Sequence, residues 1–168
     1  IMSQPGMTIN EFGQELAFTL ELPEQKPEGI AVIMHGRKSD MTKPSYVDIS
    51  SICLEAGLAT LRFDFRGHGE SHGSPEWQSY GVIDAVEDIK TIVEEIREKE
   101  LPGNQRIILI PTSFAADSSL LYASEDKDIE RVIIFSPGTG KGSSGTESNQ
   151  YREDWWDYGA SHHANTLC

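Results

Sequence analysis

Ser113 is the residue of this sequence that is best placed to act as a nucleophile. The apolar run 107–110 predicts a short buried strand, and a helix of small residues is expected over 114–124. Ser113 falls in the turn between them, where a helix N-terminus offers unpaired N–H groups and a positive dipole end. Serine becomes a good nucleophile only when a base removes its proton. The alternative is a structural serine that caps the helix, a role that serines fill routinely.

Candidates for the base and the acid that would activate this serine follow it in the chain. They are His162 and His163 as bases and Asp154 and Asp157 as acids. All four lie in a polar C-terminal stretch without a strong strand pattern, whereas a general base must be held within hydrogen-bond reach of the hydroxyl. A tail without a catalytic part is therefore the competing interpretation for these histidines.

Two aromatic residues of the same stretch, Trp155 and Trp156, are candidates for contact with a substrate. Adjacent tryptophans could line an acyl pocket. They could equally cover an exposed sheet edge as a hydrophobic cluster. The sequence leaves both interpretations open.

The glycine-rich stretch 66–73 has the residue types of a binding loop. It contains His68, Glu70 and His72, which are possible metal ligands, but no further ligands follow at the spacing of a metal site. The stretch also lacks the lysine of a phosphate-binding loop. The sequence therefore predicts no metal site and no cofactor.

Buried strands and helices alternate around Ser113. The predicted buried strands cover residues 30–34, 58–65, 107–110 and 131–135, and an alternating pattern around Phe18 predicts a strand at a sheet edge before them. Helices are expected near 46–56, 81–100 and 114–124. This order is typical of an α/β fold, a mostly parallel sheet with helices on both faces. We assign 1–138 to this core and 139–168 to an atypical polar and aromatic tail.

Composition excludes some classes of partner. The formal net charge of −13 argues against nucleic acid and against an anionic membrane surface. No apolar run is long enough to span a bilayer. Two cysteines, Cys53 and Cys168, do not make a disulfide framework, so a reduced, cytoplasmic protein is expected.

Three segments resemble the α/β-hydrolase superfamily in order and spacing. His35-Gly36 closes the first buried strand, and Phe-Asp-Phe-Arg-Gly-His-Gly-Glu-Ser (63–71) closes the next. Ser113 occupies the strand-to-helix turn that holds the nucleophile in that superfamily. The middle segment is the most specific of the three. The similarity covers roughly 18–138, and it is closest to small esterases of the feruloyl-esterase and dienelactone-hydrolase kind.

The resemblance implies acyl transfer on a carboxylic ester, with a small-molecule ester as the partner and no cofactor. Ser113 would attack the carbonyl carbon. The backbone N–H groups of Arg37 and Phe114 would form the oxyanion hole. His35 and Gly36 would border the substrate, whereas the neighbouring acidic and basic residues of segment 63–71 would brace the loop.

The sequence departs from this family at two places. The usual Gly-x-Ser-x-Gly turn is Pro111-Thr112-Ser113-Phe114-Ala115 here, and proline fixes φ and adds bulk where glycine is usual. The strands that normally hold the acid and the histidine are not visible after Phe135. A catalytically inactive, hydrolase-like protein with a role in binding or assembly is therefore the alternative function. An open sheet edge after Phe135 would pair with a second chain, so we expect a homo-oligomer.

Overall fold

The computed structural model describes residues 1–71 and 80–137 of the 168-residue chain. The segment Ile1–Pro137 is one compact unit. Its strands are β1 (Met2–Ile9), β2 (Glu15–Leu22), β3 (Ile30–Met34), β4 (Ala59–Phe63), β5 (Ile107–Ser113), β6 (Ile129–Val132) and β7 (Phe135–Pro137). Its helices are α1 (Pro44–Glu55), α2 (Val82–Glu98) and α3 (Ala115–Glu125). The predicted tail, 139–168, lies outside the described residues.

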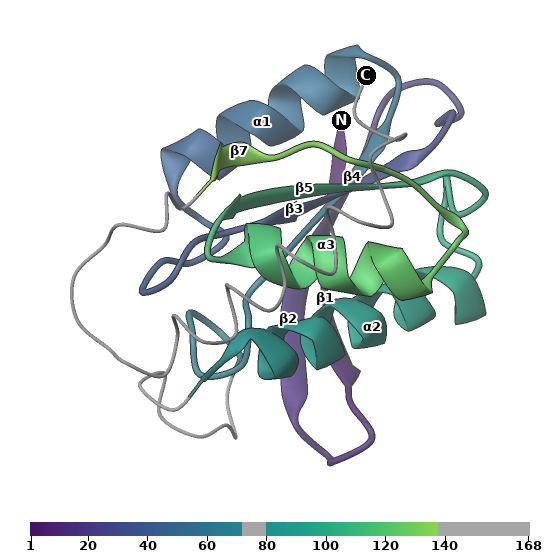
Figure 1. Cartoon of the computed structure of the whole chain (residues 1–168). Coiled ribbons are helices and arrows are strands. Elements are labelled where there is room, and N and C mark those ends of the chain that lie inside the picture. Colours follow the sequence, from purple (N-terminus) through teal and green to yellow (C-terminus); the bar gives the residue numbers. More distant parts are fainter. Residues whose placement is uncertain (72–79, 138–168) are drawn as a thin grey trace. The chain divides into compact units, whose positions relative to one another are not determined.

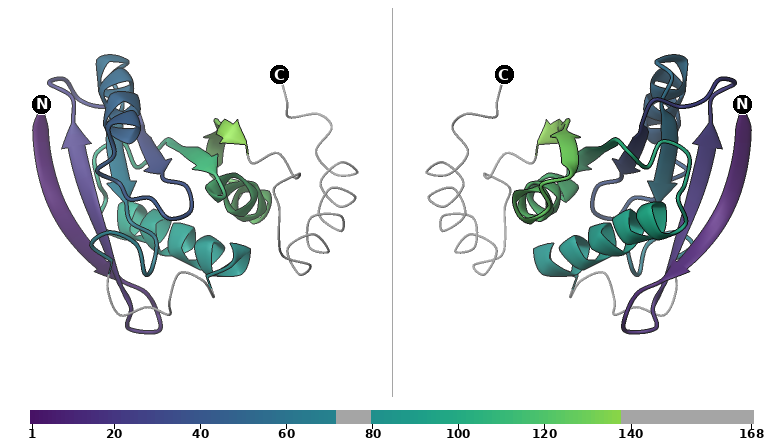
Figure 2. Two further views of the ribbon diagram at one scale, coloured as in Figure 1. Left: turned by 90° about the vertical axis from the view of Figure 1, so that its left-hand side faces the viewer. Right: turned by 90° about the vertical axis from the view of Figure 1, so that its right-hand side faces the viewer.

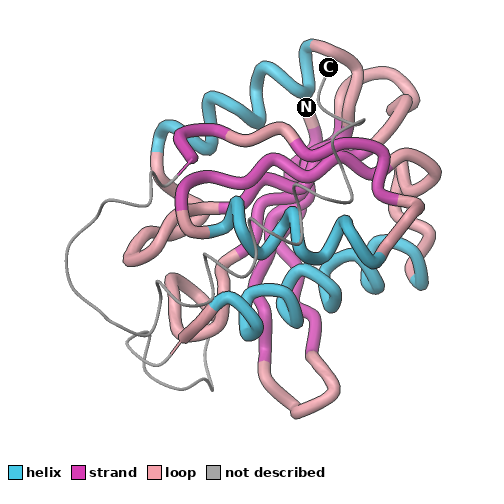
Figure 3. The backbone as a smooth tube through the Cα atoms, viewed as in Figure 1, coloured by secondary structure: helices cyan, strands magenta, loops and turns pink. Residues whose placement is uncertain are grey.

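The strands form one sheet in the order β1-β2-β4-β3-β5-β6, and β7 also pairs with β5. The pairs β1–β2 and β2–β4 are antiparallel, whereas all pairs among β3 to β7 are parallel. Figure 2 shows the strands side by side, from β1 in purple to β7 in green, and Figure 3 shows the same strands in magenta. In Figure 1, α1 covers one face of the sheet, and α2 and α3 cover the other. The predicted α/β fold with a mostly parallel sheet is thus confirmed.

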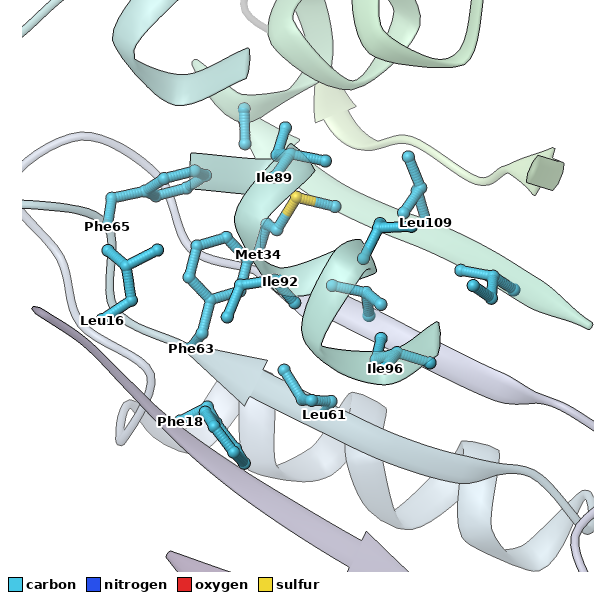
Figure 4. Close-up of a cluster of buried hydrophobic side chains, with 14 of the residues drawn as sticks. Leu16, Phe18, Met34, Leu61, Phe63, Phe65, Ile89, Ile92, Ile96 and Leu109 are labelled. Atoms are coloured by element: carbon cyan, nitrogen blue, oxygen red, sulfur yellow. The ribbon is translucent and has the colours of Figure 1, made fainter. Parts of the chain in front are cut away.

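The central strands are apolar throughout because both faces of the sheet are covered. In β3, Ile30, Val32 and Met34 belong to the larger hydrophobic cluster. The alternating residues Ala31 and Ile33 belong to a smaller cluster that includes side chains of α1. Figure 4 shows the larger cluster, in which side chains of α2 pack onto those of the sheet.

Helix α2 presents one apolar stripe to this cluster, as its sequence period predicts. Ile89, Ile92, Val93 and Ile96 are buried along it. The helix begins after Gly81, whose N–H donates to the Asp84 carboxylate at 2.8 Å, and this bond satisfies one of the unpaired groups of the first turn. No helix in residues 1–71 or 80–137 is long and apolar enough to cross a bilayer.

The prediction that the strand around Phe18 lies at a sheet edge is wrong. β2 lies inside the sheet, because β1 pairs with it from Met2↔Leu22 to Ile9↔Glu15. β1 was not predicted from the sequence, because it contains Pro5 and Gly6, and both residue types are unfavourable inside strands. Gly6 is accommodated because the Phe18 ring covers it: a Cβ at Gly6 would lie 2.2 Å from that ring.

The last predicted strand, 131–135, is divided into two. β6 and β7 both pair with β5, and two residues separate them. Ile133 and Phe135 are 44% and 46% exposed, although their apolar run resembles that of a strand buried on both faces. Within the described residues, β6 and β7 therefore have a strand neighbour on one side only.

Candidate active site

Ser113 stands at a sharp turn from strand to helix. It is the last residue of β5, Phe114 is the N-cap, and α3 begins at Ala115. Ser113 has φ +51°, a left-handed conformation that costs a non-glycine residue about 1–2 kcal/mol. Strain of this kind persists at functional sites where the surroundings over-determine it. Pro111 does not abolish the turn, because it lies within β5 opposite Met34, where extended backbone suits its fixed φ.

The loop after β3 runs beside this turn. β3 and β5 are parallel neighbours, so their carboxyl ends meet at the same edge of the sheet (Figure 1). A Cβ atom at Gly36 would lie 3.5 Å from the Cβ of Ser113 and 3.9 Å from the Thr112 carbonyl oxygen. The N–H of Gly36 donates to the Tyr46 hydroxyl at 3.1 Å, which fixes the loop to α1. The structure therefore brings the backbone of Gly36 close to Ser113.

His35 supports the loop after β3 through contacts of its ring nitrogens with backbone groups. It is 1% exposed, and its Nδ1 lies 2.7 Å from the Gly36 carbonyl oxygen. Its Nε2 accepts from the N–H of Phe65 at 3.2 Å, so Nδ1 carries the proton and donates to the carbonyl. Burial lowers the pKa of His35 to about 4, and the ring is neutral at pH 7. Both ring nitrogens are thus occupied by backbone groups, and His35 fixes the backbone of Gly36, whereas its place beside a substrate stays a prediction.

Asp64 ties the loop after β3 to the glycine-rich loop. Its Oδ1 accepts from the N–H of Met41 at 2.6 Å, and its Oδ2 accepts from the N–H of Glu70 at 2.8 Å. Burial raises the pKa of the Asp64 carboxyl, although both N–H groups favour its charged form. Gly69 packs directly on this carboxylate with φ +47°.

A buried ion pair fixes the same loop to α2. The Arg66 Nε donates to Asp88, the Arg66 N–H donates to the other oxygen of that carboxylate at 2.9 Å, and the Tyr80 hydroxyl donates there as well. Burial raises the pKa of Asp88 to about 6 despite these donors. Burial also works to lower the pKa of Arg66, but the Asp88 carboxylate outweighs it and holds that pKa above its usual value. Asp64 and Arg66 thus brace the loop, as the resemblance implied.

Arg37 and Phe114, the two predicted backbone donors, are joined by their side chains. The Arg37 guanidinium carbon lies 4.5 Å from the centre of the Phe114 ring, a cation–π contact. One guanidinium nitrogen of Arg37, Nη1, donates to the Tyr80 carbonyl oxygen at 3.0 Å. Phe114 packs edge-on against Phe65, with ring centres 5.9 Å apart. The loop after β3 and the turn after β5 are therefore held together at Ser113.

Comparison with protein families identifies the fold that carries this turn. The family model described as serine aminopeptidase, S33, matches residues 25–152. The chain belongs to this S33 family of α/β hydrolases. The match includes the strand-to-helix turn and the loops that brace it.

Solved structures share the fold of this S33 chain. Est1E from Butyrivibrio proteoclasticus, solved with ferulic acid bound, is 27% identical with a TM-score of 0.66, over 76% of this chain and 51% of that chain. The esterase Pf2001 from Pyrococcus furiosus is 22% identical with a TM-score of 0.71, over 81% of this chain and 49% of that chain, which is evidence for the fold alone. This S33 chain therefore spans about half the length of either protein.

Curated relatives of this S33 chain are also longer. An uncharacterised 31.7 kDa protein in the traX-finO intergenic region of Escherichia coli is 27% identical over 132 residues, which are 76% of this chain and 44% of that protein. The quorum-quenching protein AidA of Acinetobacter baumannii is 31% identical over 93 residues, which are 55% of this chain and 30% of that protein.

The remaining predicted site residues of the S33 chain lie outside the described part. They are the bases His162 and His163, the acids Asp154 and Asp157, and the tryptophans Trp155 and Trp156. Their positions relative to Ser113 remain predictions. Within residues 1–71 and 80–137, no group of three or more His, Cys, Asp or Glu side chains could hold a metal ion.

Sequence reasoning missed two tyrosines that position this S33 site. Tyr46 receives the N–H of Gly36, and Tyr80 binds both Arg37 through its carbonyl oxygen and Asp88 through its hydroxyl. Both tyrosines are buried, and no spacing in the sequence connects either to its partners. A buried phenol usually has a hydrogen-bond partner, which was the available signal.

Replacing Gly69 with alanine is expected to destabilise the bracing loop strongly. The new Cβ would lie 2.1 Å from an oxygen of Asp64, which would have to release the N–H of Glu70, and a hydrogen bond to a charged group contributes about 1.5–3 kcal/mol. The left-handed φ adds about 1 kcal/mol. Urea denaturation measures the sum. Gly13→Ala is the matched control, because Gly13 has φ +75° with no atom near its missing Cβ. Equal losses in the two variants would refute the packing argument.

Proposed function

We propose that this chain is a serine esterase that hydrolyses carboxylic esters through Ser113. The observation that carries the proposal is the φ of +51° at Ser113, in a turn between β5 and α3 that lies against Gly36. This turn places Ser113 directly before the N-terminus of α3, where negative charge is favoured. Its half-buried position leaves the residue partly open to solvent.

In the proposed mechanism, the Ser113 Oγ attacks the ester carbonyl carbon while a base takes the hydroxyl proton. The carbonyl oxygen becomes an oxyanion, which the backbone N–H groups of Arg37 and Phe114 receive. Each donor of this kind contributes about 3–4 kcal/mol in other hydrolases. The tetrahedral intermediate expels the alcohol, which takes the proton from the base. Water then attacks the acyl-serine by the same steps and releases the acid.

The base and the acid of this mechanism come from the segment that follows Pro137. We propose His162 or His163 as the base, with Asp154 or Asp157 as the acid that orients it. The chain order of serine, acid and histidine is that of α/β hydrolases. Trp155 and Trp156 would line the acyl side. Est1E, with ferulic acid bound in its structure, supports an aromatic carboxylic ester as a first substrate to try.

A fluorophosphonate probe tests the nucleophile directly. We expect one covalent adduct, found by peptide mass spectrometry on the peptide that contains Ser113, because the probe phosphonylates only activated serines. Ser124→Ala, which removes a helix serine bonded to the Leu121 carbonyl, should label as the unmodified chain does. An adduct on another serine, or no adduct, would overturn the proposal.

We also propose that two copies of the chain associate through the edge formed by β6 and β7. The exposed Ile133 and Phe135 on this edge support a partner strand. Light scattering at micromolar concentration should give twice the mass of one chain, and Phe135→Asp should reduce the measured mass to that of a single chain. A monomeric mass for the unmodified chain would contradict this assembly.

We further propose a cytoplasmic location, which the unpaired, buried thiol of Cys53 supports.

A further inference from the structure

Arg37 differs from the other arginines of the described residues in its charge environment. Each of the others has a carboxylate oxygen within 4.0 Å; the pairs are Arg62–Glu21, Arg66–Asp88, Arg97–Asp126, Arg106–Glu130 and Arg131–Glu130. Within residues 1–71 and 80–137, Arg37 has no such partner. The chain has a net charge of −13, so carboxylates are abundant, and Arg37 is the exception among the described arginines.

Two contacts nevertheless hold the Arg37 guanidinium in place. Its carbon Cζ lies 4.5 Å from the centre of the Phe114 ring, and its Nη1 donates to the Tyr80 carbonyl oxygen at 3.0 Å. Neither contact neutralises the charge. The side chain is exposed, and its Nε and Nη2 make no hydrogen bond to another described residue. Among the residues that the structure describes, this pre-oriented guanidinium therefore keeps donor groups without a hydrogen-bond partner.

Arg37 is joined to the nucleophile turn through both of its neighbours in the structure. It follows Gly36, where an added Cβ would lie 3.5 Å from the Cβ of Ser113, and its guanidinium contacts the ring of Phe114, the residue directly after Ser113. A substrate held at Ser113 would therefore lie against the segment that carries Arg37.

We propose that Arg37 binds a carboxylate of the substrate, so that the preferred substrates are esters that carry a free carboxylate. This inference rests on the proposed esterase function. The planar fork of arginine matches the two oxygens of a carboxylate, and charge-assisted pairs of this kind are the stronger hydrogen bonds in proteins. Stacking on Phe114 restricts the side chain in advance, which lowers the entropy cost of binding.

The test compares two esters of equal acyl length, mono-4-nitrophenyl adipate and 4-nitrophenyl hexanoate. The ratio of their kcat/KM values is measured for the unmodified chain and for Arg37→Met, which keeps the aliphatic stem and removes the charge. We expect the adipate:hexanoate ratio to fall about 10- to 100-fold in Arg37→Met. Arg37→Lys should give an intermediate ratio, because it keeps the charge without the fork. 3-Carboxy-4-nitrophenyl hexanoate, used in the same way, shows whether a carboxylate on the leaving group is bound instead.

Lys43→Gln is the matched control for charge at a distance. It also removes one positive charge, from an exposed side chain paired with Asp40, and should leave the ratio within about 2-fold. If Arg37 only held the loop in place, Arg37→Met would slow the anionic and the neutral ester alike. An anionic:neutral ratio of kcat/KM that is the same in Arg37→Met and the unmodified chain, for both carboxylate-bearing esters, would overturn the inference.

A binding measurement separates this inference from the esterase proposal. Calorimetric titration compares N-butyladipamate with the neutral N-butylhexanamide, neither of which needs to be hydrolysed. We expect N-butyladipamate to bind at least about 10-fold more weakly to Arg37→Met than to the unmodified chain. Equal affinities of N-butyladipamate for Arg37→Met and for the unmodified chain would refute a carboxylate site at Arg37, even if the chain is an active esterase. Absence of hydrolysis with this affinity difference intact would refute the esterase function alone.

Discussion

Replacing Ser113 with alanine is expected to lower kcat for 4-nitrophenyl acetate by about three orders of magnitude or more. Loss of the nucleophile in other serine hydrolases has effects of this size or larger, and the remaining rate comes from the oxyanion donors and binding. Alanine lacks only the hydroxyl, so the two backbone N–H groups of Arg37 and Phe114 keep their places. Steady-state kinetics of both proteins at equal concentration measure the effect.

The stability of Ser113→Ala must be measured alongside its activity. Ser113 already has a left-handed φ of +51°, and alanine tolerates that conformation about as poorly as serine, so unfolding free energies should agree within about 1 kcal/mol. Ser124→Ala serves as the active control, because it changes the same side chain on the surface of α3. Equal kcat values for Ser113→Ala and the unmodified chain would rule out Ser113 as the nucleophile.

The parts of the fold that depend on local pattern could be predicted from the sequence. β3 was predicted at its observed bounds, because a strand covered on both faces is apolar at every position. β1 could not be predicted, since its Pro5 and Gly6 oppose strand formation and the favourable contact is with Phe18, twelve positions after Gly6. Pairing with β2 overrides local propensity there.

In the candidate site, too, features set by local sequence were predictable, whereas contacts between distant segments were not. The turn at Ser113 was predictable, because a buried strand that breaks into a helix leaves few other conformations for the joining residue. The contacts that hold the turn were not predictable, since Arg37 meets Phe114 and Gly36 meets Tyr46 only after the sheet has formed. For the same reason, the sequence did not reveal that both nitrogens of His35 are occupied by backbone groups.

The largest effect on stability is expected from Arg66→Met. Arg66 is 4% exposed, and its removal would leave the buried carboxylate of Asp88 without its cation. Breaking a buried pair in this way costs about 3–5 kcal/mol, because the remaining charge is uncompensated. Methionine retains most of the apolar stem, so the loss is mainly electrostatic. Urea denaturation at pH 8 measures it.

Arg106→Met is the matched control for this substitution. Arg106 pairs with Glu130 at the surface, where the two side chains are 39% and 32% exposed, and solvent screens such a pair so that it contributes little to stability. A loss in Arg66→Met no larger than that in Arg106→Met would show that the buried pair contributes little to stability.

The pH dependence of the Arg66→Met effect identifies Asp88 as its cause. The folded-state pKa of Asp88 is already raised to about 6, and loss of the arginine should raise it further. A raised pKa means that the folded state takes up a proton before the unfolded state does, so the variant regains stability as the pH falls below that pKa. The difference between the unmodified chain and the variant should therefore be smaller at pH 5 than at pH 8. A difference that does not change with pH would point to lost packing, and the loop beside Ser113 would then be held by shape instead of charge.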